Sequence, residues 1–216
     1  MSTITPQILL QAYTAGIFPM AESADDSALY WIDPDKRGVF PFEKFHVSRR
    51  LRRSIRQEPF SIRINTDFEG VIEACGKCQV GRTTTWINSR IRALYGQLFR
   101  MGFCHTVECW KDGELVGGLY GVHIGGAFFG ESMFSAHTDA SKIALVYLVA
   151  RLKAGGFTLL DTQFITPHLS SMGACEIDRE DYHELLEKAL QVEGNFQLLP
   201  LDVEPEEVLQ LVSQTS

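Results

Sequence analysis

One run of residues, 104 to 135, constrains the fold of this chain more than any other. It contains two strand-like segments, CHTVECW and ELVGGLYGVHI, on either side of the turn sequence KDG, and this pattern predicts a β-hairpin. A further strand-like segment, AFFGESMFS, follows directly. Because strands joined by such short connections pair antiparallel, we expect an antiparallel sheet at the centre of the fold.

Helical and strand patterns continue on both sides of this sheet. The preceding residues predict a strand in SIRIN, a short helix in FEGVIEAC and a longer helix in INSRIRALYGQLFRMG. The following residues predict an amphipathic helix in TDASKIALVYLVARLKAGG, with Thr138 or Asp139 as its cap. FTLLDTQF then predicts a buried strand and DREDYHELLEKAL a late helix. This order is typical of an α+β or mixed α/β fold.

The first sixty residues have a different composition. Residues 6–15 predict a short helix that stops at Gly16, and LYWIDPDKRGVFPF predicts turns around short extended pieces. A second helical pattern begins at Ser48. We therefore predict a small N-terminal α/β domain over residues 1–60, followed by a larger domain over residues 61–216.

The overall composition is that of a soluble globular protein, with 45% hydrophobic and 22% charged residues. No apolar run approaches the length of a membrane span, and the start, MSTITPQILLQAY, lacks the form of a signal peptide. Five scattered cysteines, an odd number, suit a reducing compartment. We therefore expect a cytoplasmic protein with no membrane partner.

The net charge of −7 is distributed unevenly. Residues 44–100 carry twelve Lys and Arg against four Asp and Glu, whereas residues 176–216 carry two against eleven. Such asymmetry suggests a polyanionic partner for the basic part and a solvated or cation-facing surface for the acidic part. Charge placed only for solubility is the alternative.

The helix predicted from Ser48 concentrates this basic charge. Its apolar face contains Val47, Leu51 and Ile55, and five arginines point the other way. No acidic residue lies four positions from any of them, so the sequence offers no partner within the helix. We predict a phosphate-binding surface formed by Arg49, Arg50, Arg52, Arg53 and Arg56.

Two carboxylates interrupt apolar, strand-like segments, Glu131 in GGAFFGESMFS and Asp161 in LLDTQF. Carboxylates are rarely buried unless they are paired or functional. Asp161 and Gln163 are two residues apart and project to one face of a regular strand. The carboxylate can then orient the amide, and the amide can bind an amine or a carbonyl group. A polar pair at a strand end is the alternative.

Glu131 follows Gly130, and a glycine within a strand often marks a bulge or the close approach of a ligand. A salt bridge in the core, to Lys142 or Arg151, is the alternative interpretation of this carboxylate.

A zinc site is suggested by CGKC at residues 75–78 together with Cys104 and Cys109. The last two are five apart on a predicted strand, so their side chains face opposite ways and do not readily share one tetrahedral site. The histidines show no ligand spacing. We therefore predict no metal site and assign no role to Cys75 or Cys78.

Two tryptophans lie in polar surroundings, Trp31 in WIDPDKR and Trp86 in TTTWINS. Such a residue is typical of a half-exposed platform on which a flat base stacks. A packed loop anchor is the alternative.

The whole chain resembles one family, the bacterial leucyl/phenylalanyl-tRNA–protein transferases. The likeness extends from AGIFPM through YWIDPDKRGVFP, TTTWI, HTVECWKDGELVGGLYG, FFGESMFS, DASKIALVYL and LLDTQF to HLSSMGACEI. Two departures are Met20, where family members often carry Trp after GIFP, and Tyr30-Trp31, where they carry a Trp pair.

This resemblance implies an enzyme that moves leucine or phenylalanine from Leu-tRNA or Phe-tRNA to proteins with an N-terminal Arg or Lys, and so marks them for degradation by the N-degron route. It implies no cofactor and a larger domain of the acetyltransferase-like (GNAT) fold. It assigns the catalytic role to Asp161 and Gln163, with Glu131 holding the cationic acceptor and Trp31 and Trp86 stacking the adenosine. The implied aminoacyl pocket consists of Leu119, Phe128, Gly130, Met133, Leu145 and Leu160.

The implied pocket raises one difficulty, because Phe128 and Met133 have opposite parity on a regular strand. A bulge at Gly130 would resolve it.

Two other functions fit the same pattern less well. An acyl-CoA-dependent N-acetyltransferase of the same fold would need a Gly-rich turn before its central helix, where this chain has SAHTDAS. A tRNA-binding module without catalysis would leave the two carboxylates as structural residues.

Overall fold

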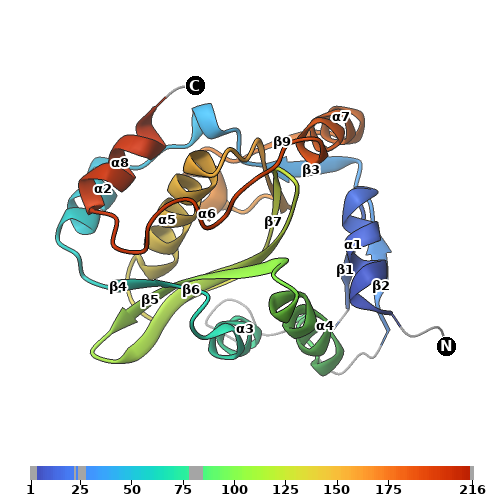
Figure 1. Ribbon diagram of the computed structural model, residues 1–216, viewed down its shortest axis with the longest axis horizontal. Coiled ribbons are helices and arrows are strands. Elements are labelled where there is room, and N and C mark those ends of the chain that lie inside the picture. Colours follow the sequence, from blue (N-terminus) through green and yellow to red (C-terminus); the bar gives the residue numbers. More distant parts are fainter. Residues whose placement is uncertain (1–3, 22, 24–27, 78–84, 215–216) are drawn as a thin grey trace.

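The computed structural model describes residues 4–21, 23, 28–77 and 85–214. Their fold is α+β, built around one mixed seven-stranded sheet in the order β4-β5-β6-β7-β8-β3-β9 (Figure 1). The strands of this sheet are β3 (Lys36–Val39), β4 (Ser61–Ile64), β5 (Cys104–Lys111), β6 (Glu114–Ile124), β7 (Ala127–Ser135), β8 (Leu159–Gln163) and β9 (Cys175–Asp178). A separate two-stranded sheet consists of β1 (Phe18–Met20) and β2 (Tyr30–Ile32).

The predicted hairpin is confirmed. β5 and β6 pair antiparallel around a turn in which Asp112 and Gly113 have φ angles of 52° and 82°. Asp and Gly are among the residues that adopt this left-handed conformation most readily, which explains why the KDG signal was reliable. β7 pairs antiparallel with β6.

The predicted bulge is also confirmed. Tyr120 on β6 pairs with Ser132, whereas the next residue, Gly121, pairs with Gly130. Glu131 is therefore the extra residue on β7, and the side-chain alternation of the strand changes there.

Helices cover both faces of the sheet (Figure 1). One hydrophobic core involves α5 (Ala140–Ala154), α2 (Arg49–Arg56) and α8 (Pro205–Ser213). The other involves α1 (Pro6–Thr14), α3 (Phe68–Gly76), α4 (Ser89–Arg100) and α7 (Arg179–Leu190). Two short helices, η1 (Phe42–Lys44) and α6 (Pro167–Ser170), lie in connections. α5 crosses between β7 and β8, which pair in parallel.

The N-terminal sixty residues contribute directly to the large sheet. β3 lies between β8 and β9 and pairs antiparallel with both. Leu51 and Ile55 of α2 belong to the same core as α5. The sheet and core of the larger predicted domain, 61–216, thus include residues from the predicted domain 1–60.

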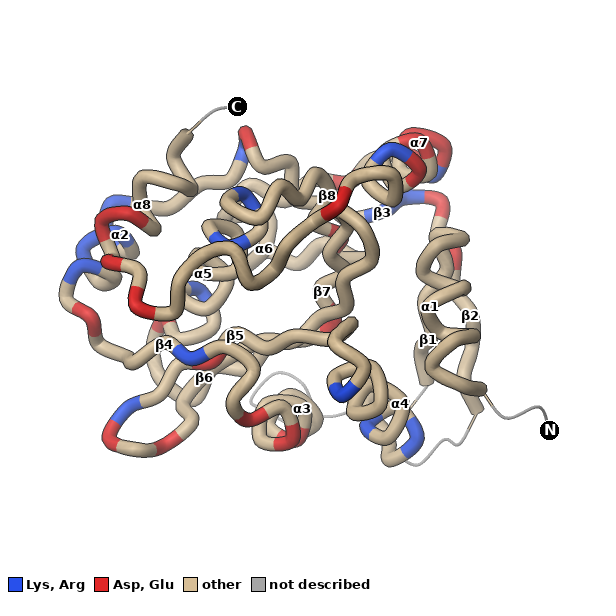
Figure 2. Tube along the Cα trace, viewed as in Figure 1, with Lys and Arg blue, Asp and Glu red and all other residues tan. Residues whose placement is uncertain are grey.

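The basic and acidic parts of the sequence do not form two separate regions of the fold. Basic α2 packs against acidic α8, which is drawn beside it in Figure 2. Arg56 of α2 forms an ion pair with Glu206 of α8, with Nε to Oε2 at 2.8 Å. Among the described residues no helix has the length and apolarity needed to cross a membrane.

Candidate active site

A cavity of about 420 Å³ opens between β7, β8, α5 and the β1 segment. Its walls are mainly apolar, with a small number of polar groups. This composition is typical of a site that encloses a small molecule or one end of a larger one. Of the six residues predicted to form an aminoacyl pocket, five line the cavity: Leu119, Gly130, Met133, Leu145 and Leu160.

Phe128, the sixth, is fully buried and is not among the cavity-lining residues. Its ring stacks on Phe196, with centroids 5.7 Å apart. The bulge at Glu131 brings Phe128 and Met133 to the same face of the sheet, where both pack in one hydrophobic core, but only Met133 lines the cavity.

Gln163 lines the cavity at the end of β8 and is only 7% exposed. Its φ angle is 55°, in the left-handed region that glutamine rarely adopts. This conformation ends the strand alternation, so Gln163 lines the cavity together with its neighbour Thr162. Its side-chain Nε2 is buried and has no hydrogen-bond partner among the described residues. It is therefore a donor available to a substrate.

Asp161 holds Gln163 in a different way from the one expected. Its Oδ1 accepts from the backbone N–H of Gln163 at 2.8 Å and not from the side-chain amide. Asp161 itself is completely buried and is not among the cavity-lining residues. The regular alternation assumed from the sequence fails at Gln163, because the left-handed residue turns the chain there.

The partner of Asp161 is Arg37 on β3. The guanidinium binds it through two nitrogens, with Nε to Oδ1 at 3.0 Å and Nη2 to Oδ2 at 2.7 Å. Arg37 is 1% exposed and also donates to the carbonyl of Gly16 at 2.8 Å. The Tyr182 hydroxyl donates to Asp161 Oδ2 at 2.8 Å. Asp161 therefore joins β8 to the N-terminal segment and to α7.

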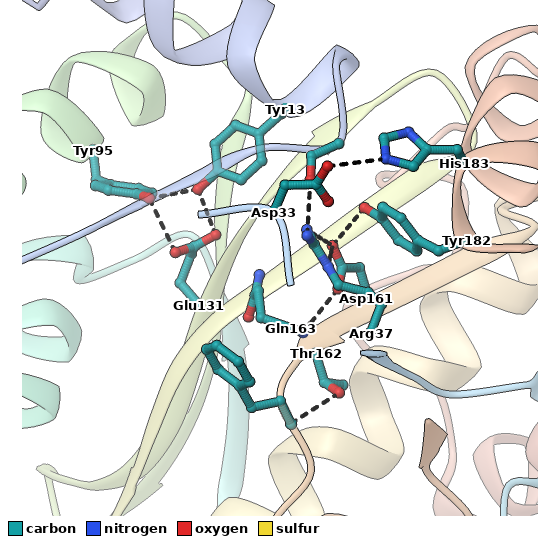
Figure 3. Close-up of polar contacts among 12 residues, drawn as sticks. Tyr13, Asp33, Arg37, Tyr95, Glu131, Asp161, Thr162, Gln163, Tyr182 and His183 are labelled. Atoms are coloured by element: carbon teal, nitrogen blue, oxygen red, sulfur yellow. Dashed lines mark hydrogen bonds and ion pairs between the residues drawn. The ribbon is translucent and has the colours of Figure 1, made fainter. Parts of the chain in front are cut away.

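Glu131 has a different environment. Its oxygens accept from the hydroxyls of Tyr13, at 2.6 Å, and Tyr95, at 3.0 Å. Burial raises the pKa of Glu131 to about 7, although these two hydrogen bonds favour the charged form. Figure 3 shows this group on one side of Gln163 and the Asp161 group on the other.

The alternative of a salt bridge from Glu131 to Arg151 is excluded. The Arg151 guanidinium instead donates to backbone carbonyls in the C-terminal segment, those of Phe196, Leu199 and Pro200. For Lys142 the structure records no ion pair with Glu131 among the described residues.

Of the two predicted stacking residues, only Trp86 lines the cavity. Trp31 is 40% exposed on β2, across from Pro19 of β1. Met20 on β1 does line the cavity, at the position where family members often carry Trp.

The five arginines of α2 divide into two groups. Arg50 and Arg56 form exposed ion pairs with Asp139 and Glu206, and Arg52 donates to the backbone of Val47 and to Ser213. The sequence could not show these partners, because they lie far along the chain. Arg49 and Arg53 are exposed, with no ion pair recorded among the described residues.

The cysteines do not gather in one place. Cys104 and Cys109 belong to the two different cores, as their spacing predicted, and Cys75 is buried in α3. Cys78 lies outside the described residues. Among the residues that the structure describes, no three potential metal ligands come together.

Sequence reasoning missed Arg37, Tyr182, Tyr13 and Tyr95. No local pattern identifies them, because each meets its carboxylate through a contact between distant segments. His168, which also lines the cavity, was seen only as one of six scattered histidines.

The fold and cavity define an α+β protein with a mainly apolar site, lined by one unpaired amide and one carboxylate. The chain matches the family described as leucyl/phenylalanyl-tRNA protein transferase over residues 39–187, and the N-terminal domain of that family over residues 2–35. The protein therefore belongs to the leucyl/phenylalanyl-tRNA–protein transferase family.

Individual relatives agree. The chain is 56% identical to the leucyl/phenylalanyl-tRNA–protein transferase of Rhodopseudomonas palustris strain TIE-1, over 99% of this chain and 96% of that protein. It is 57% identical to that of Nitrobacter winogradskyi, over 93% of this chain and 89% of that protein. Among solved structures it aligns with L-PGS from Bacillus licheniformis at 12% identity and a TM-score of 0.36, over 76% of this chain and 55% of that one.

Proposed function

We propose that this protein transfers leucine or phenylalanine from aminoacyl-tRNA to the α-amine of an N-terminal Arg or Lys, and thereby marks the acceptor for N-degron degradation. Family membership supports the reaction, and one observation in the cavity supports the site. The buried Nε2 of Gln163, which has no hydrogen-bond partner in the described part of the chain, lies in a mainly apolar cavity that Glu131 also lines. Aminoacyl-tRNA is a cytoplasmic substrate, so we place the reaction in the cytoplasm.

The proposed chemistry needs little covalent assistance. The acceptor nitrogen attacks the ester carbon, the bond to the tRNA 3′-oxygen breaks, and the proton lost by the amine ends on that oxygen. An α-amine has a pKa near 8, so about a tenth is neutral at pH 7. Most of the rate gain can come from holding amine and ester together.

Gln163 is the residue that touches the reacting atoms in this proposal. Its Oε1 can accept from the attacking amine, while its Nε2 can donate to the ester carbonyl as negative charge develops there. Asp161 acts through Gln163, by fixing the backbone from which that amide projects. It is thus a positioning residue.

The aminoacyl side chain fits the apolar wall formed by Leu119, Met133, Leu145 and Leu160. Glu131 is the one carboxylate among the cavity-lining residues described, so the cationic acceptor fits beside it. For the terminal base we propose stacking on Trp86.

We also propose the acetyltransferase-like arrangement for β5 to β8. Three antiparallel strands are followed by helix α5 and a strand parallel to the last of them, which supports it.

The tRNA surface is proposed on α2, with Arg49 and Arg53 as the cations for which no ion pair is recorded among the described residues. Replacing both by Ala should weaken tRNA binding and reduce its salt dependence by about two counterions. The matched control is Arg50→Ala with Arg56→Ala, whose side chains already have acidic partners and should matter less. Equal loss of affinity for the two pairs would remove this distinction.

One assay tests the main proposal. Purified protein is mixed with Leu-tRNA labelled in the amino acid and an Arg-starting peptide, without coenzyme A. Label should move to the peptide. An acetyltransferase would require acyl-CoA, and a tRNA-binding module would retain the label on the tRNA, so either result would contradict the proposal.

A further inference from the structure

His168 is the third titratable side chain on the cavity wall, besides Glu131 and Tyr120. It lies on α6, five residues after Gln163. Its Nε2 is buried and has no hydrogen-bond partner among the described residues. A buried polar atom without a partner costs free energy unless something else satisfies it. The reaction proposed above gives His168 no role.

The charge of His168 limits what can bind it. Burial, and after it the charge of nearby Lys142, lowers the pKa of the His168 imidazole, so the ring is neutral at pH 7. Asp139 opposes this shift weakly, and its carboxylate is already held by Arg50. An ammonium group would meet the field of Lys142 there, whereas Glu131 offers it a carboxylate on β7.

A hydroxyl group suits this nitrogen best. In a neutral imidazole, Nε2 either donates or accepts, depending on the tautomer, and a hydroxyl can match both cases. A carbonyl can only accept and an ammonium can only donate. The substrate end that enters the cavity contains one free hydroxyl beside the reacting ester, on the ribose of the terminal nucleotide.

We infer that His168 Nε2 binds the vicinal (2′) ribose hydroxyl of the terminal adenosine and so fixes the ester relative to Gln163. This inference rests on the proposed aminoacyl transfer. His168 would then contact the substrate directly and recognise its ribose. The protein should therefore discriminate between a ribose and a deoxyribose at this position.

A double cycle of protein and substrate tests this inference. Transfer to an Arg-starting peptide is measured with Leu-tRNA that ends in adenosine or in 2′-deoxyadenosine, for the wild type and for His168→Ala. Loss of either partner alone should lower kcat/KM about tenfold to a hundredfold. Loss of both should cost little more than loss of one, because the two changes remove the same contact.

Further variants separate contact from fold. His168→Gln can place an amide nitrogen near the Nε2 position and should keep part of the preference for ribose, whereas the shorter His168→Asn should lose it. His46→Ala, at an exposed histidine, should retain the wild-type preference. Binding provides a second measurement of the same preference. The affinity for amide-linked leucyl-adenosine is compared with the affinity for the analogue that lacks the 2′-hydroxyl, using the variants whose thermal stability equals that of the wild type.

The inference would be overturned if the losses of kcat/KM from the two changes multiply in the double cycle, or if His168→Ala has the wild-type kcat/KM. Either result would leave the proposed function standing. A wild type that transfers no leucine from the ribose substrate would overturn both.

Discussion

The two carboxylates of the site have opposite surroundings. Asp161 is completely buried against a guanidinium and a tyrosine hydroxyl, away from the cavity surface. Glu131 lines the cavity, and its recorded hydrogen-bond donors among the described residues are two tyrosine hydroxyls; burial raises its pKa to about 7, although the charge of Arg37 acts in the opposite direction. The comparison teaches that an acidic residue in an apolar strand has no single meaning. A cation in direct contact makes it a fixed support, whereas burial without such a contact makes it a group that exchanges protons near neutral pH.

The largest expected effect comes from removing the cation of Asp161. Arg37→Ala leaves a buried carboxylate without its counter-charge, which should lower the free energy of unfolding by about 3–5 kcal/mol. Arg37→Lys should recover part of this, because an ammonium keeps the charge but not the two-nitrogen contact. Urea denaturation measures both.

The matched control is Arg50→Ala, which breaks the ion pair between this exposed arginine and Asp139 and should destabilise the protein much less. If Arg37→Ala is no more destabilising than this control, Asp161 is not held as described.

Gln163→Ala should separate catalysis from stability. We expect about a 100-fold loss of kcat with unchanged tRNA affinity and little change in unfolding, because the amide nitrogen has no hydrogen-bond partner among the described residues. Asp161→Asn should also lower kcat, but it should destabilise the fold as well, since Arg37 then lacks its counter-charge. In single-turnover assays the double variant should be little slower than the slower single variant. Rate losses that multiply would show that the two residues act independently.

Glu131→Gln should change how stability depends on pH. The folded protein keeps a proton on Glu131 up to about pH 7, whereas the unfolded chain loses it near 4.5. The proton on Glu131 therefore contributes fully to the free energy of unfolding below about pH 4.5, and this contribution is lost as the pH rises to 7. Its size is about 2 kcal/mol after allowance for solvent at the cavity wall.

The difference in unfolding free energy, wild type minus Glu131→Gln, should fall across this pH window and then become constant. The buried histidines, such as His105 with its pKa lowered to about 3 by burial, have the opposite slope, but they are present in both proteins and cancel. A difference that is independent of pH would contradict the assigned environment.

The smallest expected effect comes from a change that leaves both carboxylates in place. Leu145→Phe narrows the apolar wall and should penalise Phe-tRNA more than Leu-tRNA, by about 1 kcal/mol or roughly fivefold in kcat/KM. Competition between the two labelled donors measures this ratio. Equal losses would mean that Leu145 does not contact the aminoacyl side chain.

Much of the fold could be predicted from local patterns. The β5–β6 hairpin follows from its turn sequence and strand-like segments, β8 from its apolar run, and α5 from its cap and its final glycines, all of which depend on neighbours in the chain. The amphipathic character expected for α5 was wrong, because its residues are buried on nearly all sides. The position of β3 between β8 and β9 could not be predicted, because it depends on pairing between segments more than a hundred residues apart. β9 itself alternates but is only four residues long, and it was missed.

The site shows the same division. Asp161, Gln163 and Glu131 stand out because polar residues interrupt apolar strands, and the bulge followed from parity and a glycine. The roles within the site depend on Arg37, Tyr182, Tyr13 and Tyr95, and no spacing rule connects these residues to the carboxylates. The left-handed conformation of Gln163 was also beyond sequence reasoning, since glutamine rarely adopts it.

Direct titration of Glu131 tests the contrast between the carboxylates most directly. With glutamate labelled by carbon-13 at the carboxyl position, NMR follows each Glu side chain as the pH is changed. We predict one resonance that titrates near pH 7 and is missing from Glu131→Gln. If every Glu carboxyl titrates below about pH 5 in the folded protein, Glu131 does not lie in the buried environment without a directly bound cation on which the comparison depends.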